Sequence, residues 1–95
     1  MERIFLLEDD EALGRGVAMA LAGPDREVSR AASLAEAKAA LTGQRFSLLV
    51  LDVNLPDGSA LDLVRGLRAA GDETPVILLT ANDLELDLSL IHISE

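Results

Sequence analysis

The stretch that decides the fold is FSLLVLDVNLPDG, residues 46–58. Five of its first six residues are apolar, and the apolar run stops at Asp52. A run that is apolar on both faces is typical of a strand buried inside a parallel sheet. The loop at residues 54–58 then brings Pro, Asp and Gly in the order of a turn. We therefore expect a buried strand that ends at Asp52 and opens into a loop.

Further strand patterns lie on either side of this run. Short apolar runs at residues 4–7 and 75–79 predict two more buried strands, and residues 27–31 predict a shorter, more polar one. Apolar residues at helical spacing, or runs rich in alanine, occupy the segments between the strands. The order βαβαβαβ predicts an α/β fold with right-handed crossovers and a parallel sheet covered on both faces. If the strand order is 2-1-3-4, the first and third strands are neighbours.

The three helices also carry start and stop signals. The first is expected over residues 13–21, before a Gly-Pro pair. Ser33 and Ser59 are each followed three residues later by an acid, which predicts capping boxes at the starts of the second and third helices. The second helix should then run to Leu41, and Gly71 should end the third.

Composition narrows the class of protein. A chain of 95 residues with 49% hydrophobic residues and a mean hydropathy of +0.28 suits one domain with a packed core. Its 17 acidic and 8 basic residues give a net charge of −9, which repels nucleic acid and suits divalent cations or basic partners. Cysteine is absent, and no apolar run approaches the ~20 residues of a membrane span. No leader peptide is recognisable. We therefore expect a cytoplasmic protein without membrane contact.

The carboxylates fall at the ends of the predicted strands. Glu8 and Asp9 end the first strand, Asp52 ends the third, and the hydroxyl residue Thr80 ends the fourth. Ligands of open α/β sheets bind outside the carboxyl ends of the strands. With the strand order 2-1-3-4, Asp9 and Asp52 would converge there, with Glu8 close by. Three carboxylates within ~4 Å of one another repel by roughly 4 kcal/mol per pair at an effective dielectric near 20. A bound divalent cation or a proton relieves this repulsion, and Mg²⁺ suits such oxygen ligands.

This arrangement predicts phosphoryl-transfer chemistry. A carboxylate beside Mg²⁺ can attack a phosphoryl group and form an aspartyl-phosphate, and Thr80 could donate its hydroxyl to a phosphoryl oxygen. A capping role is the better interpretation for Asp10 or Glu11, and it stays open for Asp9. Asp52 has no helix to cap. The glycines of residues 14–16 lie inside a helix and are interpreted as packing residues.

Three stretches resemble the signature motifs of response-regulator receiver domains of two-component signalling: residues 6–10, 48–58 and 76–81. The resemblance covers residues 2 to about 87 and implies a flavodoxin-like fold. It also implies that Asp52 accepts a phosphoryl group from a sensor histidine kinase, and that the chain is a signalling domain rather than an enzyme. In this family, the motif Leu-Pro-Asp-Gly, found here at residues 55–58, is commonest in regulators that carry a winged-helix DNA-binding domain after the receiver. The resemblance therefore implies a parent protein of that kind.

The resemblance also implies roles for individual residues. Mg²⁺ would be bound by Asp9, by Asp52 and by the backbone carbonyl of Asn54, with Glu8 acting through water. Thr80 would be the switch hydroxyl that moves toward the phosphoryl group. DNA would be contacted only through the missing output domain.

The end of the chain departs from the family pattern. Residues 1–87 resemble a truncated receiver domain without the family's fifth strand, last helix and conserved lysine, since the only lysine is Lys38 in the second predicted helix. Residues 88–95 resemble translated sequencing-adapter read-through, and we expect a non-native tail there. The fourth strand would then be an apolar edge, which predicts self-association or a tail strand folded back over it.

Three other functions compete with this interpretation. A haloacid-dehalogenase-type phosphatase wants an acid two residues after the nucleophile, where this chain has Asn54. An FMN-binding flavodoxin would need Ser, Thr and Gly in its first loop, and Glu8 to Asp10 would repel the phosphate. A receiver-like interaction module that is never phosphorylated stays open.

Overall fold

The computed structural model describes residues 1–81 and 88–93. In chain order the elements are β1 (Glu2–Leu7), α1 (Glu11–Leu21), β2 (Arg26–Ala31), α2 (Leu34–Gly43), β3 (Leu48–Asp52), β4 (Asn54–Leu55), β5 (Gly58–Ser59), α3 (Ala60–Ala69), β6 (Val76–Ala81) and β7 (Leu88–Ile93). None of the helices in this described part is long and apolar enough to cross a membrane.

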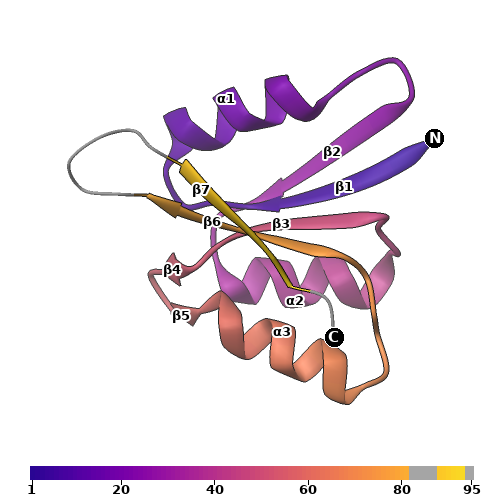
Figure 1. The fold of residues 1–95 in the computed structure, drawn as a ribbon, viewed down its shortest axis with the longest axis vertical. Coiled ribbons are helices and arrows are strands. Elements are labelled where there is room, and N and C mark those ends of the chain that lie inside the picture. The colour runs from indigo at the N-terminus through magenta and orange to yellow at the C-terminus, as the bar shows by residue number, and fades with distance from the viewer. Residues whose placement is uncertain (82–87, 94–95) are drawn as a thin grey trace.

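The main sheet has the order β2-β1-β3-β6-β7. Its first four strands are parallel, with Ile4 opposite Leu48 between β1 and β3 and Leu49 opposite Val76 between β3 and β6. The predicted order 2-1-3-4 is therefore confirmed for these strands. Figure 1 shows α1 on one face of the sheet and α2 and α3 on the other.

Burial on both faces explains why β1 is apolar at every position from Ile4 to Leu7, beyond its exposed first residues Glu2 and Arg3. Successive side chains of a strand point to opposite faces of the sheet. Phe5 and Leu7 of β1 pack in the core beneath α2 and α3, whereas Ile4 and Leu6 pack beneath α1. Because both faces are covered, neither side of β1 is left for polar residues between Ile4 and Leu7. The same holds for β3, where Leu51 is fully buried on the α2 and α3 side.

The helix starts follow the predicted signals, with two differences. The Oγ of Ser33 accepts from the N–H of Glu36 at 3.3 Å, but the Glu36 carboxylate accepts from Ala32 N–H at 2.8 Å rather than from Ser33. Ser59 caps α3 by accepting from Leu61 N–H at 3.2 Å rather than from the expected position 62. Both serines are caps, but neither completes the reciprocal pair of a capping box.

The loop after β3 contains a short hairpin that the sequence did not predict. β4 and β5 pair antiparallel, with Asn54 opposite Ser59 and Leu55 opposite Gly58. Gly58 has a φ of +145°, a region that other residues rarely adopt. A Cβ there would lie 2.8 Å from Cδ1 of Leu34 in α2. The turn residues at 56–58 therefore serve a hairpin seated against the start of α2.

β7 covers the outer edge of β6. It pairs antiparallel along the whole of β6, from Val76 opposite Ile93 to Ala81 opposite Leu88. Of the two outcomes predicted for this apolar edge, the structure shows the tail strand folded back. The fifth strand of the sheet is thus antiparallel to the other four.

We expect deletion of residues 88–95 to cause self-association, because the backbone groups of β6 that pair with β7 would become free to pair with another chain. Analytical ultracentrifugation of the shortened and full chains across a range of concentrations measures this. A shortened chain that stays monomeric at every concentration would show that the β6 edge does not need this cover.

Candidate metal centre

The parallel pairing of β1 and β3 places their following residues at one edge of the sheet. Leu7 lies opposite Leu51, so Glu8 and Asp52 come next on neighbouring strands. The N–H of Glu8 donates to Ala31 of β2 at 3.0 Å, which continues the sheet pairing one residue past β1. The backbone at this edge is therefore fixed by hydrogen bonds to both neighbours of β1.

Three carboxylates meet at this edge. Glu8, Asp9 and Asp52 each offer an oxygen atom, and these oxygens all lie within 4.8 Å of one another. Glu8 is buried with 7% of its surface exposed, Asp52 is half-buried, and Asp9 is exposed. The structure thus brings together the three acids that the sequence predicted would converge.

Burial makes the charges of this cluster costly. It raises the pKa of Glu8 from 4.5 to about 7; the Asp10 N–H, 3.0 Å from the Glu8 carboxylate, opposes this, and the charge of Asp52 adds to it. Burial also raises the pKa of Asp52, although a hydrogen bond from Glu8 opposes that rise. A proton on Glu8, donated toward Asp52, is one way to relieve the repulsion. A cation among the three acids is the other.

The donor set fits Mg²⁺. It consists of carboxylate oxygens at the surface end of a buried site, where a hard divalent cation can keep some of its waters. Among the described residues, these three acids form the cluster that could hold a metal ion. The arrangement therefore suits the cation that the sequence predicted.

The structure describes the remaining predicted residues less completely. The N–H of Asn54 lies 3.4 Å from Oδ1 of Asp52, so the start of β4 is held next to the cluster. Thr80 does not end its strand, because β6 continues to Ala81 and Thr80 pairs with Ser89. Its backbone follows Leu79, the partner of Asp52, and its hydroxyl lies outside what the structure describes.

The sequence predicted roles for three residues beside the cluster, a helix cap for Asp10 and packing for the two glycines of α1. Asp10 caps α1, accepting from Leu13 N–H at 3.0 Å, as expected. Gly14 is buried, and a Cβ there would lie 3.2 Å from the Arg30 guanidinium and 3.5 Å from Cγ of Glu8, which supports its interpretation as a packing residue. Gly16 has nothing within 4 Å of a Cβ, so packing does not explain it.

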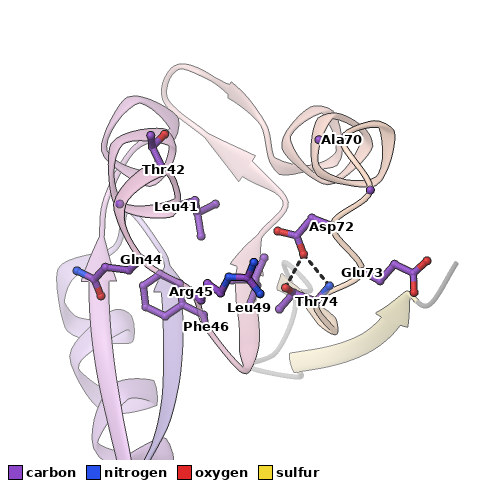
Figure 2. A pocket seen from close by; sticks show the side chains of 12 residues that line it. Leu41, Thr42, Gln44, Arg45, Phe46, Leu49, Ala70, Asp72, Glu73 and Thr74 are labelled. Atoms are coloured by element: carbon purple, nitrogen blue, oxygen red, sulfur yellow. Dashed lines mark hydrogen bonds between the residues drawn. The ribbon is translucent and has the colours of Figure 1, made fainter.

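A hollow of about 730 Å³ lies at the opposite end of the strands (Figure 2). It is bounded by the ends of α2 and α3 and by Phe46 and Leu49, at the start of β3 rather than at Asp52. Arg45, Asp72 and Glu73 give it mixed charge, and Asp72 is occupied by hydrogen bonds from the N–H and hydroxyl of Thr74 at 2.9 and 2.6 Å. It offers no convergent acids comparable to the cluster.

Asp57 has a role that sequence reasoning missed. Its carboxylate accepts hydrogen bonds from Leu34 N–H at 2.9 Å and Ala35 N–H at 3.1 Å, at the start of α2. These bonds hold the pKa of Asp57 below its usual value. The sequence marked Asp57 as a turn residue, but a contact across more than 20 positions leaves no local pattern.

Four parallel strands covered by helices on both faces, with acids at the carboxyl ends of β1 and β3, define a flavodoxin-like α/β domain with an acidic cluster that could hold a cation. Comparison with known proteins identifies the family within this class. The model of the response regulator receiver domain matches residues 4–90, and the chain belongs to this family.

Individual relatives agree with the family. The chain is 45% identical over 85 residues to the response regulator protein PmrA of Pseudomonas aeruginosa, covering 90% of the chain and 38% of PmrA. It is 35% identical over 88 residues to the transcriptional regulatory protein AfsQ1 of Streptomyces coelicolor, covering 93% of the chain and 39% of AfsQ1. The chain thus spans well under half the length of either relative.

A solved structure shows the same fold. The non-phosphorylated HemR receiver domain from Leptospira biflexa superposes with a TM-score of 0.77 at 35% identity, over 86% of this chain and 66% of that one. The predicted fold class and the predicted resemblance are both confirmed.

We expect the stability of the metal-free domain to fall as pH rises from about 4.5 to 7. In that window folded Glu8 holds a proton that the unfolded chain has released, because its pKa is raised from 4.5 to about 7. The folded state is therefore favoured at the acidic end, and the loss is on the order of 1–3 kcal/mol. Urea denaturation in EDTA at a series of pH values measures it.

Glu8→Gln should flatten this dependence, while Glu2→Gln, at an exposed position, should leave it unchanged. Mg²⁺ should restore stability at the alkaline end, because it binds the ionised acids. If the free energy of unfolding of the wild type did not change between pH 4.5 and 7, this would contradict the raised pKa of Glu8.

Proposed function

We propose that this chain accepts a phosphoryl group on Asp52 from a sensor histidine kinase, with Mg²⁺ held by Asp9, Asp52 and the backbone carbonyl of Asn54. Glu8 would act through a water ligand. The observation that carries the proposal is the convergence of Glu8, Asp9 and Asp52 within 4.8 Å at the end of β1 and β3.

The reaction follows from the placement of Asp52. A carboxylate oxygen of Asp52 attacks the phosphorus of a phosphohistidine, the P–N bond breaks, and the histidine nitrogen leaves with the bonding electrons and takes up a proton. Bound Mg²⁺ would supply charge stabilisation for the phosphoryl oxygens. Asp52 ends β3, which is buried on both faces, and a carboxylate fixed in this way supports its proposed role as the nucleophile.

The neighbouring acids complete the proposed site. Ionised Asp9 and Glu8 would balance the cation when Asp52 carries the phosphoryl group. Thr80 would then contact a phosphoryl oxygen as the switch hydroxyl. In this proposal the chain is a stoichiometric signalling domain and not an enzyme that turns over substrate.

The output of the whole protein is part of the proposal. AfsQ1 is named a transcriptional regulatory protein and is longer than the region that matches this chain. We place DNA binding in a further domain, because the −9 charge of this chain repels nucleic acid. A cytoplasmic location, where a sensor kinase would present its phosphohistidine, belongs to the same proposal.

We expect incubation with acetyl phosphate and Mg²⁺ to give a single phosphoryl adduct, because the proposal has one nucleophile, Asp52. Intact-mass spectrometry detects the adduct, and hydroxylamine should remove it, as acyl phosphates are labile to this nucleophile. Asp52→Asn should abolish it, whereas Asp62→Asn, which changes an exposed acid on α3, should not.

The rival functions give different results in the same assay. Steady release of phosphate from a phosphate ester, with no accumulating adduct, would favour a phosphatase. A wild-type mass that stays unchanged would favour a receiver-like interaction module and would contradict the proposal.

A further inference from the structure

The hairpin after the phosphoacceptor strand is fastened to α2 by Asp57. The first turn of an α-helix has N–H groups without partners inside the helix. In α2 the Asp57 carboxylate accepts from Leu34 and Ala35, and the Ser33 Oγ accepts from Glu36. Asp57 therefore takes two of these donors, although it lies 22 and 23 positions further along the chain. A carboxylate also suits the positive end of the helix dipole.

A second contact holds the same hairpin against the same helix turn. Gly58 approaches Leu34 so closely that a Cβ would lie 2.8 Å from its Cδ1. Leu55, on the other strand of the hairpin, is buried in the core that α2 and α3 share. The hairpin thus rests on α2 through hydrogen bonds, a close backbone approach and an apolar anchor.

The other end of the hairpin reaches Asp52. The N–H of Asn54 lies 3.4 Å from Oδ1 of Asp52. Val53 is held on both sides, because its N–H donates to Leu79 at 3.4 Å and its carbonyl accepts from Ala60 at 3.0 Å. The segment from Val53 to Asp57 is therefore a short bridge between the acidic cluster and the start of α2.

We propose that Asp57 is a positioning residue for the phosphoacceptor site: by capping α2 it fixes the hairpin, and through the hairpin it fixes the Asn54 backbone beside Asp52. The inference rests on the proposed function for its consequence, namely Mg²⁺ binding, but the clamp itself does not depend on that function. Accepting two N–H hydrogen bonds lowers the pKa of Asp57, which means that these bonds favour its charged form, the form that suits the positive end of α2.

The test compares two caps of the same helix. Asp57→Ala removes the cap that reaches the hairpin, and Ser33→Ala removes the cap that does not. Each loss of a cap should lower the Tm by several degrees, about 4–8 °C for a domain of this size. Calorimetric titration of the 95-residue chain with Mg²⁺ should then distinguish the two variants. We expect a roughly tenfold weaker Mg²⁺ affinity for Asp57→Ala, as for other groups that orient metal ligands, and an affinity within twofold of wild type for Ser33→Ala.

Asp57→Asn should recover part of the affinity, because its amide oxygen can still accept one of the two hydrogen bonds. Equal Mg²⁺ affinity in wild type and Asp57→Ala would overturn the proposal. So would an equal loss in Ser33→Ala, since the effect would then come from loosening α2 in general.

Hydrogen exchange tests the clamp without a metal. The amides of Leu55, Gly58 and Ala60 should exchange faster in Asp57→Ala than in Ser33→Ala or wild type. If the wild type shows no Mg²⁺ binding, the proposed function fails, while exchange still decides whether Asp57 fixes the hairpin. Unchanged exchange of these amides in Asp57→Ala overturns the clamp.

Discussion

Repulsion among Glu8, Asp9 and Asp52 is the constraint on which the site depends. β1 and β3 are adjacent and parallel, so the acids at their carboxyl ends lie at the same edge of the sheet, with oxygens within 4.8 Å of one another. Glu8 is buried, and water screens its charge poorly. A proton or a cation that reduces the net charge of the cluster would stabilise it, so folding is linked to protonation at this edge of the sheet and, in the proposed function, to Mg²⁺ binding as well.

The sheet supplies the rigidity that such a site requires. β1 and β3 are buried on both faces, beneath α1 on one side and beneath α2 and α3 on the other (Figure 1). A strand packed in this way has little freedom to move its last residue away from a neighbour of like charge. The fold therefore holds the acids together against their repulsion. The hairpin of residues 54–59 adds a second support from the direction of α2.

Much of the fold and of the acid cluster could be predicted from sequence. The strands at residues 4–7 and 46–52 are apolar on both faces, and this pattern identifies a covered parallel sheet. Once the strand order is inferred, the placement of Asp9 and Asp52 follows, because parallel strands end at the same edge. The cap at Asp10 was also predictable, because a helix pattern begins next to it.

What the sequence did not show depends on contacts between distant segments. Asp57 bonds to Leu34 and Ala35, and no local spacing records such a pair. The pairing of Gly58 with Leu55 is only two residues long, too short for a strand pattern. The capping-box pattern predicted that Ser59 accepts from the N–H of residue 62, but Ser59 is also the last residue of the hairpin and accepts from Leu61 N–H. The sequence predicted that the β6 edge would be covered, but it could not decide between a tail strand such as β7 and a second chain.

The most direct test of the central claim is a ¹³C NMR titration of the carboxyl carbons of Glu8 and Asp52, with and without Mg²⁺. Without Mg²⁺, we expect a midpoint near pH 7 for Glu8 and one above the usual 3.8 for Asp52. With Mg²⁺, both midpoints should move to lower pH, because the cation favours the ionised acids. Midpoints at the ordinary values of 4.5 and 3.8, unmoved by Mg²⁺, would contradict a shared cation site at the end of β1 and β3.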